Sequence, residues 1–187
     1  MALETTNIEN IICDKHNMIL KRDKINNIFT IEFSISNPNI EIKNIVDVGL
    51  YKVLAEINKD IIEKIDFIDD DKDSINTKLL FVFKRFGGDF GIAQKYMFLE
   101  TKRIDNGTQI ILESKSIPYA SLIKNCEIAT SKFANIYVDL IDKHSTTIKY
   151  IFNIDFHEDL PIYMENMVGV LMKKIFLRVK SFIENIR

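Results

Sequence analysis

Apolar and polar positions follow two different periods along this chain. In residues 28–35 they alternate, so that the apolar side chains share one face, and this alternation predicts a half-buried β-strand. In residues 159–186 they recur at every third or fourth position, which predicts one long amphipathic helix. Pro161 suits the first turn of that helix, because its missing N–H is not needed there, and Asp159 precedes it as a candidate cap.

The chain between these two segments adds one helical stretch and six alternating ones. Apolar residues have helical spacing in residues 45–57. Acidic or Gly-containing turns separate several of the alternating segments, and Asp105-Asn106-Gly107 is the clearest hairpin signal. The alternating segments are 60–69, 75–85, 95–104, 108–117, 128–141 and 146–156. An antiparallel sheet that curls around a long helix would bury both apolar faces, so the pattern predicts an α+β fold of this kind.

The N-terminal part of the chain has a weaker pattern than the rest. Residues 1–27 show only a faint helical spacing in Ile8, Ile11 and Ile12. We therefore expect a partly helical N-terminal extension that packs on a domain formed by residues 28–187. A chain of 187 residues suits one domain with a sizeable core.

Composition narrows the class of protein. Apolar residues make up 47% of the chain, charged residues 28%, and the formal net charge is −2, which is typical of a globular protein and offers no basic field for nucleic acid. No apolar run is long enough to span a membrane. Cys13 and Cys126 indicate two free thiols in a reducing compartment, with a single disulfide as the alternative. We expect a cytoplasmic protein; export directed by a removed N-terminal signal stays open.

Three stretches together resemble the START domain, the lipid-transfer module related to the steroidogenic acute regulatory protein. Residues 95–118 resemble the family's central hairpin, a long aromatic-rich strand, an acidic turn and a strand that ends in a Ser-basic-Ser-aliphatic run. Residues 147–155 resemble its final strand, and Asp159-Leu160-Pro161 resembles the start of its closing helix. The chain departs from the family in having Gln94-Lys95 where members usually carry Arg-Asp, and in having no tryptophan.

The resemblance implies a helix-grip fold in which a curved antiparallel sheet wraps the long C-terminal helix around an internal hydrophobic cavity. It implies a protein that carries a single lipid in this tunnel between membranes, most readily a phospholipid, with ceramide or sterol as alternatives. Each buried methylene of such a lipid contributes about 0.8 kcal/mol. Carrying a lipid is a binding cycle, so we expect no catalytic residues, no cofactor and no metal. The partners implied are the lipid and a transient membrane surface, and the chain is expected to act as a monomer.

Candidate tunnel residues come from the strands and from the last helix. Whether the charged strand residues point into the tunnel, where they would meet a headgroup, or out to solvent depends on side-chain parity. Tyr96, Tyr119, Tyr137 and Tyr150 are candidates for a choline cage or for core and rim aromatics. The candidate headgroup and tunnel residues are Arg85, Glu100, Arg103, Glu113, Lys115, Tyr150, Asp155, Met164, Met167, Val168, Leu171 and Ile175.

A glycine-rich stretch in residues 86–93 combines mobility with apolar side chains. The resemblance places it over the tunnel mouth, where we expect a gate that dips into a bilayer; the alternative is that its side chains pack on the core. The gate candidates are Phe86, Gly87, Gly88, Phe90, Gly91, Ile92 and Leu160. His157-Glu158-Asp159 is interpreted as a polar loop with a helix cap and not as a metal site.

Two other functions compete with lipid transfer. One is an enzyme on the same scaffold, such as a cyclase, which would need an acid–base pair facing the cavity. The other is a regulatory interaction module with a filled core. A cavity on the order of several hundred Å³ would favour the carrier or the enzyme, and a packed centre would favour the module.

Overall fold

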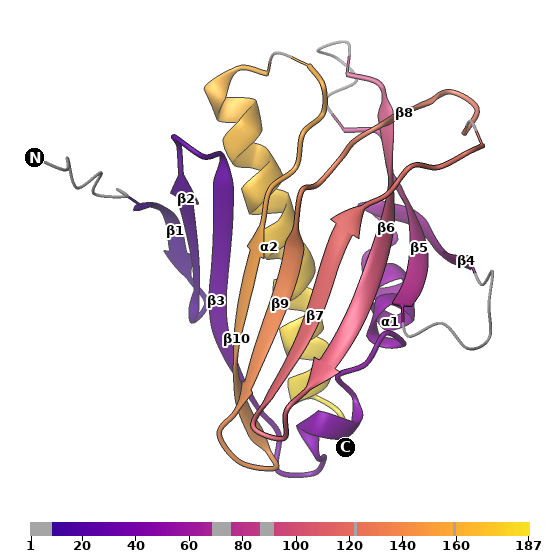
Figure 1. The fold of residues 1–187 in the computed structure, drawn as a ribbon. Coiled ribbons are helices and arrows are strands. Elements are labelled where there is room, and N and C mark those ends of the chain that lie inside the picture. Colours follow the sequence, from indigo (N-terminus) through magenta and orange to yellow (C-terminus); the bar gives the residue numbers. More distant parts are fainter. Residues whose placement is uncertain (1–8, 69–75, 87–91, 122, 159) are drawn as a thin grey trace, which may run out of the picture.

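A computed structural model of the protein describes residues 9–68, 76–86, 92–121, 123–158 and 160–187 (Figure 1). Within these residues, ten strands and three helical segments follow one another in an order that ends on the longest helix. The strands are β1 (Glu9–Lys15), β2 (Met18–Asp23), β3 (Ile28–Ser36), β4 (Ile62–Ile68), β5 (Asn76–Phe83), β6 (Gln94–Asp105), β7 (Gln109–Ser116), β8 (Cys126–Ile128), β9 (Ala134–Leu140) and β10 (Ser145–Phe152). The helical segments are η1 (Ile42–Asn44), α1 (Leu50–Ile57) and α2 (Ile162–Glu184).

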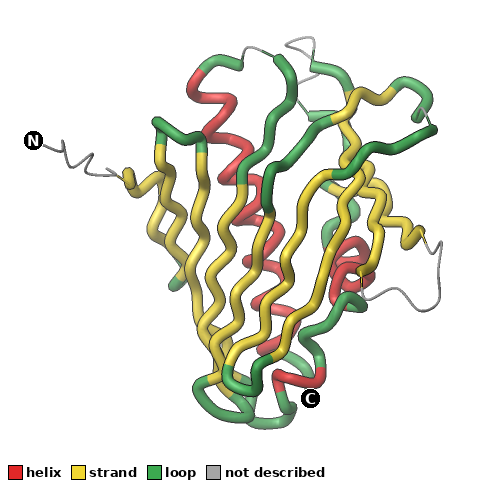
Figure 2. Tube along the Cα trace, viewed as in Figure 1, coloured by secondary structure: helices red, strands yellow, loops and turns green. Residues whose placement is uncertain are grey.

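The strands form one curved sheet whose concave face holds the helices. Their order is β1-β2-β3-β10-β9-β7-β6-β5-β4, and each neighbouring pair along this path is antiparallel. The short strand β8 pairs in parallel with β6 outside this path. Figure 2 shows the sheet as one layer, with α2 running along one of its faces, as the predicted α+β helix-grip architecture requires.

The hydrophobic pattern predicted most of the described strands and missed three of them, β1, β2 and the short β8. The alternation in residues 28–35 corresponds to β3, and the expected hairpins correspond to β4–β5, β6–β7 and β9–β10. The described part of the expected N-terminal extension is not helical but forms β1 and β2, which continue the sheet beyond β3. The reason is strand pairing, because β2 buries Met18 and Leu20 against the core and forms hydrogen bonds with β3. These tertiary contacts determine the secondary structure of a segment whose own hydrophobic pattern is weak.

The long C-terminal helix covers the sheet with one face. Met164, Val168, Ile175 and Val179 are buried there as expected, whereas Phe182 is 41% exposed. Lys173 falls between the apolar positions of this helix, where the helical period predicts exposure, but it is buried. Its Nζ donates to the carbonyl oxygens of Lys15 and Met18 at the β1–β2 turn. No helix among the described residues has the length and apolar character needed to cross a bilayer.

Both faces of the sheet carry apolar clusters, but of unequal size. The main core fills the concave side between the sheet, α1 and α2. A smaller cluster lies on the opposite face of β5 and β6, where Leu80, Val82, Tyr96 and Phe98 pack under the connection that contains β8. The main core is therefore where an internal cavity can form.

Candidate functional site

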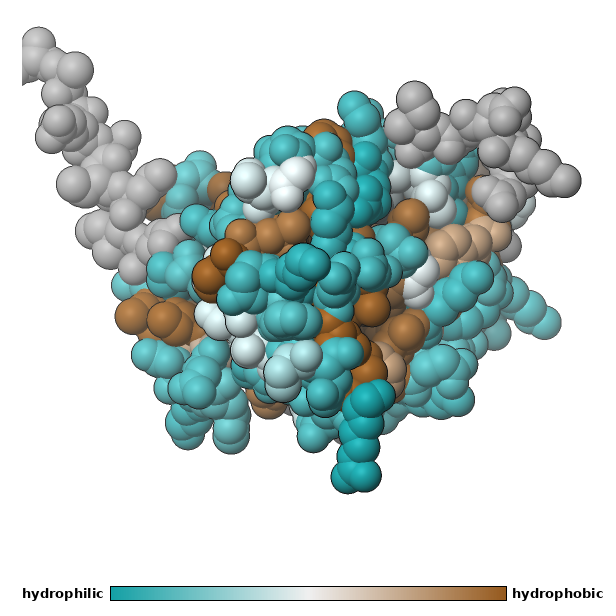
Figure 3. All heavy atoms as spheres, turned by 90° about the horizontal axis from the view of Figure 1, so that it is seen from below, coloured by the Kyte–Doolittle hydropathy of each residue, from teal (hydrophilic) through white to brown (hydrophobic). Residues whose placement is uncertain are grey.

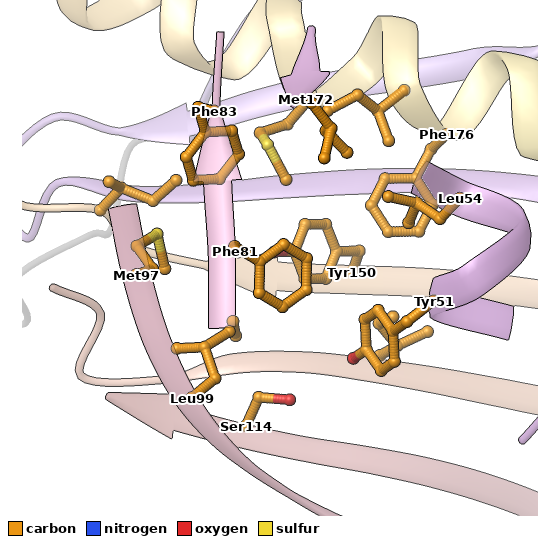
Figure 4. Close-up of a pocket in the computed structure, with 15 residues that line it drawn as sticks. Tyr51, Leu54, Phe81, Phe83, Met97, Leu99, Ser114, Tyr150, Met172 and Phe176 are labelled. Atoms are coloured by element: carbon orange, nitrogen blue, oxygen red, sulfur yellow. The ribbon is translucent and has the colours of Figure 1, made fainter. Parts of the chain in front are cut away.

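A small cavity lies inside the main core, enclosed by the sheet on one side and by α1 and α2 on the other (Figure 4). It has a volume of about 40 Å³, which is room for about three water molecules. Its lining is Tyr51, Leu54, Ile62, Phe81, Phe83, Met97, Leu99, Ser114, Ala134, Ile136, Tyr150, Ile154, Met172, Ile175 and Phe176. The centre of the fold is thus nearly filled, and most of the side chains around the remaining space are apolar.

Alternation along the strands explains this lining. Met97, Leu99 and Thr101 of β6 face the concave side, whereas Tyr96 and Phe98 face the outer cluster. The same alternation places the side chains of Phe81 and Phe83 of β5 in the cavity lining. Helix α2 adds Met172, Ile175 and Phe176, whose spacing of three and four places them on one face.

Polar atoms of the described lining side chains are hydroxyl groups. Tyr51 of α1 and Ser114 of β7 point their oxygens toward the same side of the cavity in Figure 4. Thr101 of β6 lies next to Ser114, and their hydroxyl oxygens are 2.8 Å apart. The Tyr51 hydroxyl lies close to both of these hydroxyls. Three elements therefore meet in one cluster of three uncharged hydroxyls, which we call the hydroxyl cluster.

Burial makes the two cavity tyrosines weak acids. Desolvation raises the pKa of Tyr51, and hydrogen bonds from Ser114 and Thr101 offset part of that rise. Desolvation also raises the pKa of Tyr150, whose ring packs on Phe152 and Phe176. Both side chains therefore stay neutral at physiological pH.

A buried cation lies near the start of β6, two residues before Met97 of the cavity lining. Lys95 is 1% exposed, and its Nζ is 2.8 Å from a carboxylate oxygen of Glu127, is hydrogen-bonded to Glu158 and is 3.3 Å from the carbonyl oxygen of Phe156. Burial alone would lower the pKa of Lys95, but the hydrogen bonds to Glu127 and Glu158 raise it. Its three N–H bonds are all used within the protein, so it serves to join β6, β8 and the connection before α2.

A second buried cation joins β2 to the start of α2. Arg22 is 3% exposed and donates hydrogen bonds to Glu165 and Asn166 of α2 and to Asn27, at 2.6, 2.8 and 2.8 Å. Its guanidinium also lies 5.1 Å from the centre of the Phe29 ring. A small polar cleft of about 80 Å³ adjoins this contact and is lined by Asp155, Leu160 and Val168, among others.

The charged strand residues proposed for a headgroup do not line the cavity. Glu100, Glu113 and Lys115 border a cleft on the outer face of the sheet, and Lys115 pairs with Glu100 at 3.7 Å. Parity is the reason, since Thr101 and Ser114 take the inward positions between them. Arg103 shares the inward parity but lies at the sheet end, where it donates to the carbonyl oxygen of Val46. Arg85 is exposed and donates to the carbonyl oxygen of Ile92.

The helix candidates are distributed over several environments. Ile175 lines the cavity, and Leu171 packs against the core without lining it. Met164 is buried, whereas Met167 is 53% exposed. Among the four tyrosines considered for a choline cage, Tyr150 lines the cavity, while Tyr96 and Tyr119 belong to the outer cluster and Tyr137 is half-buried on the outer face. These four do not form a cage.

The gate candidates that the structure describes lie against the core. The Phe86 ring contacts the Phe156 ring edge-on, with centroids 5.6 Å apart, and Ile92 is 3% exposed. Leu160 also packs against the core. Gly87, Gly88, Phe90 and Gly91 lie outside the described residues. For Phe86 and Ile92 the structure matches the alternative in which these side chains fold back on the core.

Sequence reasoning missed most of the lining. The alternation predicted in residues 75–85 puts Phe81 and Phe83 on one face of a strand, but the two were not among the candidate tunnel residues. The signal that could have found the hydroxyl cluster is polar residues at inward positions: Thr101 continues the face of Met97 and Leu99, and Ser114 continues the face of Leu112. Tyr51 lay within the predicted helix 45–57, and its partners could be known only once α1 was placed over β6 and β7.

Comparison with known proteins gives the fold a name. No protein-family profile matches the chain, and no curated protein matches it in sequence. Among solved structures, human STARD10 matches with a TM-score of 0.77 at 10% identity, over 94% of this chain and 72% of that chain. The lipid transfer and protein localization domain of human StarD13 matches with a TM-score of 0.73 at 12% identity, over 95% and 90% of the two chains.

A plant enzyme shares the scaffold at a lower similarity. Norcoclaurine synthase from Thalictrum flavum matches with a TM-score of 0.51 at 17% identity, over 91% of each chain. At such identities the matches establish the architecture alone. The chain has the START helix-grip fold, as its sequence motifs predict.

Proposed function

We propose that this chain binds one lipid molecule between the sheet and α2 and carries it between membranes that face the cytoplasm, as a monomer. The observation that carries the proposal is an interior that side chains do not fill completely and whose lining is apolar apart from a few hydroxyls. Apolar surface of this kind keeps acyl or ring carbons from water. The fold is also that of StarD13's lipid transfer domain, which supports a lipid as the ligand.

The cavity must widen before a lipid enters, because about 40 Å³ holds no acyl chain. Two of its lining side chains, Met97 and Met172, are unbranched and adapt their shape readily. Helix α2 contributes Met172, Ile175 and Phe176, so a small displacement of α2 from the sheet enlarges the whole space at once. Lipid uptake is therefore a movement of α2 away from the sheet, driven by apolar contact with the ligand.

Membrane contact is proposed for the end of the molecule where α2 begins. Exposed apolar side chains gather there: Ile162, Tyr163 and Met167 are 66, 54 and 53% exposed. Ile25, at the β2–β3 turn beside α2, is 79% exposed. Each such side chain, if fully buried in a bilayer, contributes about 1.5–3 kcal/mol, which suits reversible docking.

A binding cycle accounts for the site better than a reaction does. The polar groups of the described lining are hydroxyls that stay neutral at physiological pH, and an acid–base step needs a group that titrates near the working pH. The buried cations Lys95 and Arg22 are occupied by carboxylates. We therefore propose that the chain is not an enzyme.

The small cavity volume favours a second candidate. A START-like core that is filled by its own side chains would serve as an interaction or regulatory module without transfer activity. The cavity volume of about 40 Å³ is the specific observation that favours this interaction module. The two candidates differ in whether the protein takes up any lipid at all.

Lipid uptake is the test that separates them. The full chain is purified from lipid-containing cells, and native mass spectrometry records any bound lipid; transfer of labelled lipid between liposomes is then measured. Co-purified lipid together with transfer supports the carrier. A protein that stays lipid-free when offered liposomes of mixed composition, and accelerates no transfer, contradicts the carrier and leaves the interaction module.

A cavity-filling variant makes the test specific to this site. Ala134 of β9 is 5% exposed and lines the cavity, so Ala134→Leu fills the space that a lipid needs. We expect lipid uptake to fall at least tenfold while the protein stays folded. Ala120→Leu, an equal enlargement at an exposed loop position, is the matched control and should leave uptake unchanged. Equal uptake by the two variants would place the lipid elsewhere.

A further inference from the structure

The cavity combines an apolar lining with polar groups of one kind. Apart from the hydroxyls of Tyr51, Ser114 and Tyr150, its described lining side chains are aliphatic, aromatic or thioether groups. Burying an ionised group in such a space costs far more than a hydrogen bond returns unless an opposite charge meets it. The lining therefore discriminates between lipids by the charge of their polar end.

The nearby cations do not change this. Lys95 and Arg22 are both buried, but their donors are engaged by Glu127 and Glu158 in one case and by Glu165, Asn166 and Asn27 in the other. The Nε of Arg22 has no partner, yet Arg22 does not line the cavity. A phosphate group that reached either side chain would have to displace carboxylates that already neutralise it.

The hydroxyl cluster offers chemistry that suits a neutral group. Each hydroxyl has one donor and two acceptor sites, so hydrogen bonds within the cluster leave acceptor sites free. A ligand hydroxyl can donate to such a site, and it can accept in return when one hydroxyl of the cluster rotates. A phosphodiester can only accept, so it would leave the acceptor sites of the cluster unused, and the lining offers its charge no counter-charge.

The position of the cluster fixes the orientation of a ligand. On β6, Lys95 lies near the start of the strand, and Thr101 follows six residues further along it, which is a distance of about 20 Å. Met97 and Leu99 line the cavity between these two positions. A ligand that enters from the Lys95 end thus reaches the hydroxyl cluster with its leading polar end and lays its apolar body along Met97 and Leu99.

On the premise that the chain is a lipid carrier, we propose that its ligand is a neutral lipid whose polar end is a hydroxyl group, and not a phospholipid. Tyr51 and Ser114 hold this hydroxyl from the cavity wall, and Thr101 supports Ser114 through their hydrogen bond. Sterols and diacylglycerols share this chemistry.

Competition among lipids of matched chains tests the ligand class. The delipidated protein is titrated with cholesterol, 1,2-dioleoylglycerol, dioleoylphosphatidylcholine and dioleoylphosphatidylserine, and bound lipid is quantified by native mass spectrometry. We expect cholesterol or dioleoylglycerol to bind at least tenfold more tightly than either phospholipid. Tighter binding of a phospholipid overturns this inference and leaves the carrier function standing. Binding of none of the four overturns both.

A thermodynamic cycle, in which the protein and the ligand each lose their hydroxyl groups in turn, tests the hydroxyl cluster itself. Thr101→Val with Ser114→Ala removes two hydroxyls at nearly constant volume, and each lipid is compared with its analogue that lacks the hydroxyl. The double variant should lose about tenfold in affinity for the hydroxylated lipid and little for the analogue. Equal losses for both ligands would contradict a hydrogen bond from the cluster.

Two further variants keep this experiment decisive. Tyr51→Phe removes the phenolic oxygen alone and replaces the double variant if that variant unfolds; the same selective loss for the hydroxylated lipid is expected. Thr147→Val makes the same change at an exposed position of β10 and should alter neither affinity. A selective loss caused by Thr147→Val would show that the cluster is not its source.

Discussion

At the scale of single residues, Gly169 determines how closely α2 approaches the sheet. A Cβ at this position would lie 2.6 and 2.7 Å from Cδ1 and Cε1 of the Phe29 ring, closer than van der Waals contact permits. The ring cannot move aside easily, because it is 2% exposed and stacks on Phe152 with centroids 5.3 Å apart. The glycine therefore lowers the helix propensity of α2 but allows the helix and β3 to cross closely.

Gly169→Ala should destabilise the fold by about 1 kcal/mol, because an overpacking cost of about 1–3 kcal/mol exceeds a propensity gain of about 1 kcal/mol. Urea unfolding measures the change. Val170→Ala, at the next and 47% exposed position, is the control for a change in helix propensity alone. Adding Phe29→Leu should recover part of the loss by relieving the contact. A Gly169→Ala variant more stable than the wild type would disprove the close crossing.

At the scale of elements, an ionic clasp holds α2 to the turn that follows α1. The Asp60 carboxylate accepts hydrogen bonds from both terminal nitrogens of the Arg178 guanidinium, Nη1 and Nη2, the latter at 2.9 Å. It also accepts one from Lys174 Nζ at 3.0 Å. Arg178 also donates to Asn58, which is fully buried. These hydrogen bonds, from Arg178 first and then from Lys174, hold the pKa of Asp60 far below its usual range. The clasp therefore fixes α1, and with it Tyr51, relative to α2.

This clasp makes stability depend on pH in acid. Asp60 has a lower pKa in the folded protein than in the unfolded chain, where it is about 3.9. Its contribution is full above that value and is lost as pH falls through the folded pKa. Asp60→Asn should thus lower the melting temperature modestly at pH 7, and the difference from wild type should shrink below about pH 4. An unchanged difference down to pH 2.5 would contradict the prediction; Asp14→Asn, at an exposed site on β1, controls for lost charge.

Which elements the sequence could reveal depended on whether each element carried its own pattern. β3 and β10 alternate clearly because one face is buried and the other is exposed, and both were predicted. β1 and β2 were not, because β1 lies at the edge of the sheet and Arg22 and Asp23 interrupt the apolar pattern of β2. The candidate site was harder still. Its lining follows from parity, but its volume depends on how closely α2 approaches the sheet, which rests on contacts such as Gly169 with Phe29.

At the scale of the whole molecule, the two ends of the fold differ in the surface they present. The end where α2 begins carries a stripe of Tyr163, Met167 and Val170, which are 54, 53 and 47% exposed and share one helix face. Arg22 ties the β2–β3 turn to the first turns of α2, so Ile25 lies near this stripe. The opposite end, seen from below in Figure 3, is mostly hydrophilic with scattered apolar patches. The end where α2 begins is therefore the end at which we propose membrane contact.

If this end docks on membranes, charges on the stripe should slow lipid transfer without abolishing lipid binding. Tyr163→Glu with Met167→Glu removes two apolar contacts, and burial of each contributes about 1.5–3 kcal/mol, so we expect liposome-to-liposome transfer to slow at least about tenfold. Bound lipid, measured by native mass spectrometry, should stay unchanged because neither residue lines the cavity. Phe182→Glu places the same charge at a 41% exposed position near the other end of α2 and should leave transfer intact. Equal slowing by both variants would mean that negative charge anywhere on the helix repels the membrane, and docking would not be specific to this end.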